Sequence, residues 1–145
     1  MIDTIITNMK TQIAAVITDY SELKLAYNVE DNSKLATSKT YSVLPTGAAE
    51  TEGVLRHFTM DQSIIIQLTD DYIAKKTDDS TKRQIVIDLM DNALNIYKDM
   101  VNSKCGTPAS VKNVRDLSIE DPIFFENDDT VQLNMNFTIT YRVSL

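Results

Sequence analysis

Residues 131–143, VQLNMNFTITYRV, place an apolar side chain at every odd position. Every even position from Gln132 to Ser144 is polar. This strict period of two predicts one long β-strand that buries one face and leaves the other polar. In an antiparallel sheet such a polar face can meet water, a neighbouring subunit or a lumen. It comprises Gln132, Asn134, Asn136, Thr138, Thr140 and Arg142.

Two other stretches have the period of an amphipathic helix. Apolar residues recur at spacings of three and four over residues 2–20, and again from Ile85 to Met100. Asp78 can cap the start of the second helix, and Gly106 marks its end. Further apolar residues widen the stripe of this helix, so it can cover two surfaces; they are Val86, Met90, Leu94 and Val101.

The stretches between these elements predict further strands and one irregular segment. Alternation over 23–29 and from Arg56 to Leu68 predicts strands, with Gln62 as the polar exception on the apolar face of the second. Residues 31–54 are weakly patterned and contain Pro45, so we expect a long extended arm that the fold can lose, with room for a short strand at Tyr41–Leu44.

The order of these elements predicts the fold class. A helix, a strand, an arm, a strand, a helix and then two or more strands indicate an α+β fold. We expect a largely antiparallel sheet with two main helices packed on one face. The whole chain, residues 1–145, is expected to form a single domain.

Composition restricts the classes of partner. The chain has 14 basic and 21 acidic residues and a formal net charge of -7, which disfavours general binding to nucleic acid. A single cysteine excludes an internal disulfide and fits a reducing compartment. Because no apolar stretch approaches the ~18 residues of a membrane span, we expect no membrane partner.

The sequence contains no recognisable catalytic constellation. None of the three glycines lies in a strand-to-helix phosphate loop. His57 is the only histidine, and nothing in the sequence places it near Cys105. The acidic pairs fit turns and helix caps better than a calcium loop. We therefore expect a protein that is not an enzyme and has no cofactor or metal.

Several segments together suggest a family. Leu55–Thr59, Ile64–Leu68 followed by Asp70-Asp71-Tyr72, Glu120-Asp121-Pro122, and above all Met135–Val143 occur in this order. This layout resembles the small tail-terminator and head–tail joining (neck) proteins of tailed bacteriophages. The resemblance spans most of the chain but has no single diagnostic motif.

The resemblance implies a structural virion protein. Its copies would form a homo-oligomeric ring, expected to be a hexamer, at the head-proximal end of the tail. The ring would terminate the tail tube and join it to the neck or head, with the tail tube protein and neck or head adaptor proteins as partners. Assembly would occur in the host cytoplasm, and genomic DNA would pass through an acidic lumen without specific binding.

Seven residues are subunit-contact candidates under this resemblance: Tyr41, Val43, Leu44, Arg56, Asp70, Asp71 and Arg142. Two alternatives stay open. The protein could be another head–tail connector or neck adaptor, which the layout does not separate from a terminator. It could also be a small-ligand binding module, which would need a pocket with convergent polar groups.

Overall fold

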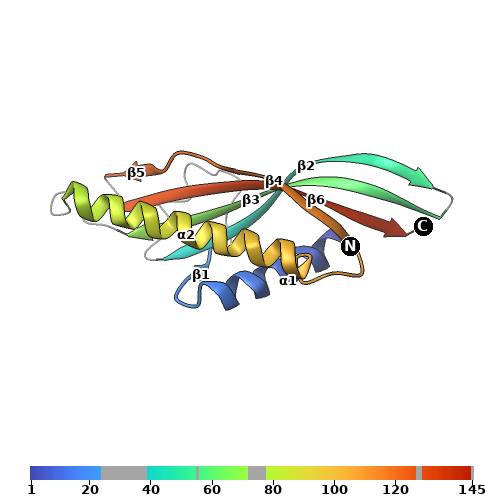
Figure 1. Cartoon of the computed structure of the whole chain (residues 1–145), viewed down its shortest axis with the longest axis horizontal. Coiled ribbons are helices and arrows are strands. Elements are labelled where there is room, and N and C mark those ends of the chain that lie inside the picture. Colours follow the sequence, from blue (N-terminus) through green and yellow to red (C-terminus); the bar gives the residue numbers. More distant parts are fainter. Residues whose placement is uncertain (24–38, 55, 72–77, 127–128, 145) are drawn as a thin grey trace.

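The computed structural model describes residues 1–23, 39–54, 56–71, 78–126 and 129–144. Two helices and six strands follow one another along the chain (Figure 1): α1 (Ile2–Val16), β1 (Ser21–Glu22), β2 (Thr40–Val54), β3 (His57–Asp71), α2 (Asp79–Ser103), β4 (Val111–Ile119), β5 (Ile123–Phe125) and β6 (Thr130–Ser144). Neither of the described helices is long and apolar enough to cross a membrane.

One six-stranded sheet forms the frame of the molecule. Its strand order is β1-β2-β3-β6-β4, and β5 pairs with β6 beyond the end of β4. All pairs are antiparallel except the short parallel pair of β1 and β2. The pairing of β3 with β6 is unbroken from His57↔Ser144 to Asp71↔Thr130. The sequence prediction of an α+β fold with a largely antiparallel sheet is therefore confirmed.

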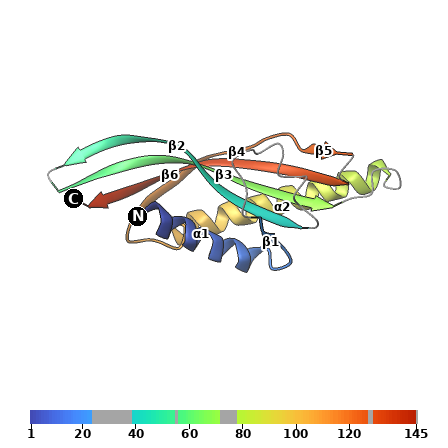
Figure 2. The ribbon, with the colours of Figure 1, turned by 180° about the vertical axis from the view of Figure 1, so that it is seen from behind.

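Both helices lie on the same face of the sheet (Figures 1 and 2). Helix α1 buries Ile5, Met9 and Ile13, and α2 buries Leu89, Ala93, Ile96 and Met100. Opposite them, the odd-numbered residues of β6 from Val131 to Tyr141 and the even-numbered residues Ile64, Ile66 and Leu68 of β3 complete the core. Each large apolar side chain buried in this way contributes roughly 1.5–3 kcal/mol.

The ends of α2 are fixed by local chemistry. The Asp78 side chain accepts a hydrogen bond from the Thr81 amide at 2.7 Å, which caps the helix as the sequence predicts. After the helix the chain turns through left-handed residues, Lys104 and Gly106. Asn8 of α1 donates hydrogen bonds to the Gly106 carbonyl and the Thr107 hydroxyl, so this turn also anchors α1.

The structure corrects the expected arm at 31–54. Residues 40–54 are a fifteen-residue strand, β2, paired with β3 from Thr40↔Thr69 to Val54↔His57. Residues 46–53 are exposed, so no buried face imposes an alternation, and the partner strand determines their conformation. Because Tyr41 and Val43 belong to the core, the fold cannot lose this segment. The remaining arm residues, 31–38, and most of the predicted strand at 23–29 lie outside the described residues.

The polar face of β6 is less exposed than its sequence suggests. The side chains of Gln132 and Asn134 are buried, with exposed fractions of 0% and 6%. Gln67 of β3 donates a hydrogen bond from its amide nitrogen to the amide oxygen of Asn134 at 3.2 Å. Only the C-terminal part of this face, which ends at Arg142, reaches solvent. The face predicted to meet water, a neighbour or a lumen is therefore partly an internal polar layer.

The three long strands extend beyond both helices at the end of the molecule that holds the two termini (Figures 1 and 2). There β2, β3 and β6 form a ribbon built from residues 46–54, 57–63 and 138–144. We call this part the ribbon. It gives the molecule an elongated shape, with a helix-covered body and a projecting sheet.

Candidate functional site

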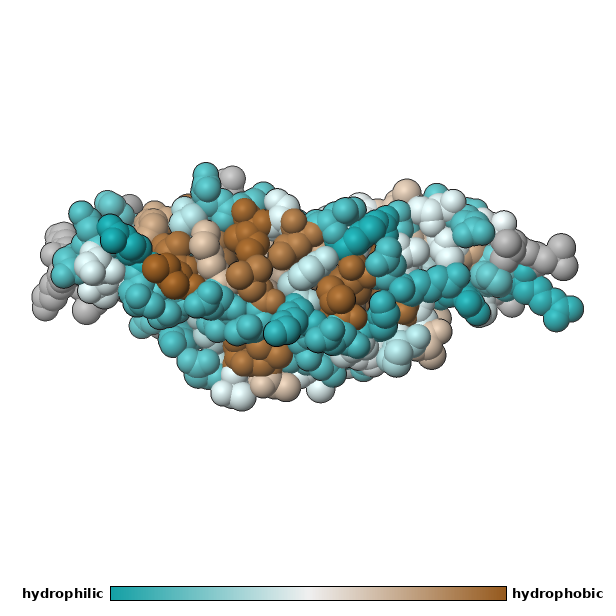
Figure 3. All heavy atoms as spheres, viewed as in Figure 1, coloured by the Kyte–Doolittle hydropathy of each residue, from teal (hydrophilic) through white to brown (hydrophobic). Residues whose placement is uncertain are grey.

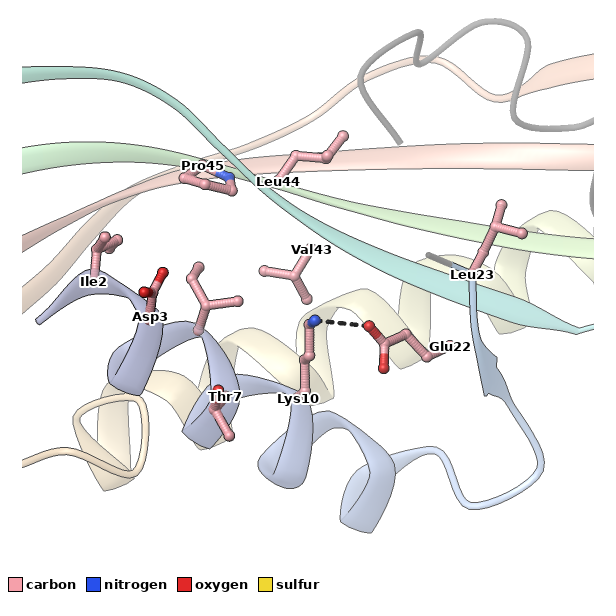
Figure 4. Close-up of a pocket in the computed structure, with 10 residues that line it drawn as sticks. Ile2, Asp3, Thr7, Lys10, Glu22, Leu23, Val43, Leu44 and Pro45 are labelled. Atoms are coloured by element: carbon pink, nitrogen blue, oxygen red, sulfur yellow. Dashed lines mark ion pairs between the residues drawn. The ribbon is translucent and has the colours of Figure 1, made fainter. Parts of the chain in front are cut away.

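A groove lies between α1 and the outer strand β2 (Figure 4). Its volume is about 400 Å³. The residues that line it come from three elements: Ile2, Asp3, Ile6, Thr7 and Lys10 of α1, Glu22 and Leu23 at β1, and Val43, Leu44 and Pro45 of β2. Six of these ten residues are apolar, and Asp3, Lys10 and Glu22 bring charged groups to the same groove.

One ion pair joins two walls of the groove. The Lys10 ammonium lies 2.7 Å from the Glu22 carboxylate and connects α1 to the segment that follows it (Figure 4). Both side chains are partly exposed, so the pair contributes at most about 1 kcal/mol to stability. Both partners line the groove together with Val43.

The groove runs beside one edge of the sheet. The Tyr41 carbonyl accepts a hydrogen bond from the Leu23 amide at 2.7 Å, and β1 pairs only with Thr40 and Tyr41. Among the described residues, no strand pairs with this edge of β2 beyond Tyr41. Pro45 lies on the same edge and lacks an amide hydrogen, a common feature of edge strands.

A buried glutamine supports the irregular part of this edge. The register of β2 against β3 shifts between Pro45 and Ala48. The Gln62 amide nitrogen lies within 3.3 Å of the carbonyl oxygens of Thr46, Gly47 and Ser63 and donates to them. Gln62 is only 5% exposed. The polar exception noted in the sequence thus supplies hydrogen bonds to the bulge.

On the ribbon, a polar cluster connects β3, β6 and β4. The Asp61 carboxylate accepts hydrogen bonds from the Thr140 hydroxyl at 2.5 Å and from the Arg115 guanidinium at 2.6 Å. The Thr140 hydrogen bond, followed by the Arg115 hydrogen bond and charge, lowers the pKa of Asp61 below its ordinary value. This cluster fixes the ribbon to β4, the strand on the opposite edge of the sheet.

The seven contact candidates from the sequence fall in three regions. Tyr41, Val43 and Leu44 are buried on β2, and the latter two line the groove. Arg56 and Arg142 are exposed at the end of the ribbon, where Arg142 pairs with Thr59.

The other two candidates, Asp70 and Asp71, lie at the opposite end of the sheet. Asp71 is exposed, whereas Asp70 is buried, and burial raises the pKa of its carboxyl above the ordinary value. The Asp71 backbone amide donates to the Asp70 carboxylate at 2.8 Å. One continuous contact surface therefore cannot contain all seven candidates.

Sequence reasoning did not identify the groove. Its α1 wall, Ile2, Ile6 and Lys10, was visible only as one side of an amphipathic stripe, and the β2 wall was assigned to an arm. A groove of this kind depends on which edge strand the helix lies beside. That relation between distant segments leaves no local signal in the sequence.

Metal-ligating and thiol-bearing side chains are dispersed over the described residues. They contain no group of three or more histidine, cysteine, aspartate or glutamate residues that could hold a metal ion. His57 pairs with Ser144 at the ribbon end. Cys105 is fully buried behind α2, and burial raises the pKa of its thiol to about 12.

Comparisons with known proteins give little further information. No family model matches the sequence. No curated protein matches it either. Among solved structures, the chain is similar to one from the virion of a native gene transfer agent particle, with 11% identity and a TM-score of 0.46. The similarity covers 93% of this chain and 92% of that chain. At this level of similarity it supports no functional argument.

Proposed function

We propose that the protein is a structural component of a virion of the tailed-phage type. In this proposal its copies form a ring, taken to be a hexamer, at the head-proximal end of the tail. The ring terminates the tail tube and joins it to the neck or head, and the subunits assemble in the host cytoplasm. The proposal extends the resemblance of the sequence to tail-terminator and head–tail joining proteins.

The observation that carries the proposal is that one molecule has both a projecting ribbon and a groove. The ribbon extends beyond the helices, while a groove with a mixed apolar and charged lining lies beside β2. A ring forms when one patch of a subunit binds a different patch of the next and the rotation closes. A ribbon docked along the α1–β2 side of its neighbour is such a contact.

The charge of the chain is compatible with a DNA passage. The net charge of -7 would repel phosphate and let DNA slide through a lumen without specific binding. The exposed part of β2 adds Glu50 and Glu52 to the ribbon.

The proposal is tested by the solution mass of the protein and of one groove variant. Light scattering over a wide concentration range should give a closed multiple of the 16.3 kDa chain mass. Thr7→Arg places a long charged side chain at the groove wall from an exposed position and should shift the mass towards smaller species. Thr4→Arg is the matched control, since Thr4 is exposed on the same helix outside the groove lining.

Two results would count against the proposal in different ways. A monomer at every concentration would exclude self-assembly of the free protein. A ring that Thr7→Arg leaves intact would exclude the groove as the contact. Rescue of extracts that lack either the tail terminator or a neck adaptor would separate the ring role from that of another head–tail connector.

The groove itself favours a second candidate, a small-ligand binding module. Its 400 Å³ volume and the polar groups of Asp3, Lys10 and Glu22 are in the range of small-molecule sites. A thermal-shift screen with metabolites and metal ions tests this candidate. Stabilisation that Thr7→Arg abolishes and Thr4→Arg preserves would support it over the structural role.

A further inference from the structure

Helix α2 carries a second apolar stripe, which lies at the margin of the core and is exposed at two of its five positions. Its members are Ile87, Met90, Leu94, Tyr97 and Val101, and we call this stripe the α2 seam. The seam is centred about 110° around the helix from the buried stripe of Leu89, Ala93, Ile96 and Met100. The seam therefore lies on the side of α2 and not on the surface that packs on the sheet.

The seam is open to solvent at its most apolar positions. Leu94 is 49% exposed and Ile87 is 42% exposed, whereas Met90, Tyr97 and Val101 are partly buried at the margin of the core. Separate apolar patches, interrupted by polar residues, appear on the face of the molecule where α2 lies (Figure 3). The other flank of the helix turns towards the end of α1, where Asn92 donates to the Tyr20 hydroxyl at 3.4 Å. Helix α1 therefore does not cover the seam.

The spacing of the seam indicates what can cover it. Its residues alternate at intervals of three and four over two full heptads, which is the pattern that packs against another helix. The seam is about 21 Å long, as expected for fourteen residue steps of a helix. A partner helix of similar length is therefore the occupant that fits.

Charges beside the seam select a particular partner. Asp91 and Lys98 are both exposed and flank the seam on its solvent side, one heptad apart. When two such helices pack antiparallel, flanking residues of this type face each other across the contact. In the register that packs Leu94 against Tyr97 of a second copy, Asp91 lies opposite Lys98 of that copy. Two-fold symmetry repeats this favourable pair.

Other arrangements of two seams lack this complementarity. Sliding the antiparallel pair by one heptad places Asp91 opposite Asp91 of the second copy, which is repulsive. Parallel packing places Asp91 beside Val86 or Ala93, which offer no charge. The charge pattern therefore favours one antiparallel register.

We propose that the α2 seam binds the α2 seam of a second copy of this chain, antiparallel about a two-fold axis. This contact is isologous, so it differs in kind from the heterologous contact of a ring, and it does not depend on the proposed ring. Where both contacts form, they connect two rings.

Charge exchange tests the proposal. Asp91→Lys and Lys98→Asp each turn two attractive pairs into two repulsive ones, and each should weaken the dimer about tenfold. The double variant restores opposite charges and should dimerise within a few-fold of the wild type. A mixture of the two single variants should form mixed dimers in preference to either self-dimer.

The measurement is sedimentation equilibrium in the Thr7→Arg background, which separates this contact from the ring contact. Asn95→Lys on the polar side of α2 is the control, and circular dichroism checks that each variant folds. Leu94→Asp should abolish the dimer. A wild-type monomer up to about 0.5 mM, or a double variant as weak as the single variants, would overturn the proposal. A monomer in this experiment would not decide the ring proposal, because the ring contact uses the groove and the groove does not include the seam.

Discussion

Replacing Gln62 with glutamate tests whether its side chain stabilises the bulge in β2. The substitution keeps the size of the side chain but replaces the amide donor with a carboxylate that faces three carbonyl oxygens. One NH₂ group has two hydrogens, so the native side chain makes two full hydrogen bonds at a time. At roughly 1 kcal/mol each, their loss costs about 2 kcal/mol.

The buried charge adds to this cost. Gln62 is 5% exposed, so burial and the carbonyl oxygens should raise the pKa of the introduced carboxyl above its usual value of about 4.3. Each unit of such a rise costs about 1.4 kcal/mol at neutral pH. We therefore expect a total loss of about 3 kcal/mol at pH 7, or roughly 6–12 °C in Tm for a chain of this size.

The pH dependence of the Tm difference is the more specific test. A carboxyl with a raised pKa in the folded state destabilises the protein above that pKa, and this penalty disappears as the pH falls through it. The difference in Tm between Gln62→Glu and the wild type should therefore narrow from pH 7 to pH 4. Gln84→Glu on the exposed surface of α2 is the control; it removes an exposed hydrogen bond to Asp88 and places two carboxylates four residues apart, so a loss of no more than about 1 kcal/mol is expected. A Gln62→Glu protein as stable as the wild type at pH 7 would refute this account of the bulge.

Two further changes probe other parts of the fold. Asp61→Asn should destabilise the protein by about 1 kcal/mol at pH 7. Because Thr140 and Arg115 lower the pKa of Asp61, its contribution to stability is present above about pH 4 and is lost as the pH falls through the lowered pKa. Urea unfolding at several pH values measures this dependence. The thiol of Cys105, with a pKa of about 12 and no exposed surface, should react with a thiol reagent such as DTNB only after unfolding; rapid modification of the native protein would contradict its burial.

The sequence predicts those helices and strands that bury one face and expose the other. Strand β6 alternates because its odd residues enter the core, and α2 has a recognisable cap at Asp78. Most of the long strand β2 escapes prediction because Thr46 to Gly53 are exposed, contain no buried stripe, and include only two β-branched residues, Thr46 and Thr51. Its conformation depends on β3, a partner supplied by tertiary structure.

The candidate site was less accessible to sequence reasoning than the fold. Val43 and Leu44 were selected as contact candidates, and both line the groove, but Ile6, Thr7 and Lys10 were not selected. Their relevance comes from the position of α1 beside an edge strand. The acidic pair Asp70–Asp71 was interpreted as part of an exposed turn. The carboxyl of Asp70 is buried instead.

The irregular edges of the sheet also limit how strands of another copy could add to it. Strand β2 is interrupted by Pro45 and by two register shifts, and β4 has shifts of its own next to Asp116, whose φ is 64°. Such irregularities prevent long strands from adding to an edge, which protects a sheet of this length from uncontrolled aggregation. Contacts between copies must then use side chains, and these are available at the groove and at the α2 seam. The irregular edges therefore explain how the sheet can contain strands of fifteen residues without inviting further strands to add to it.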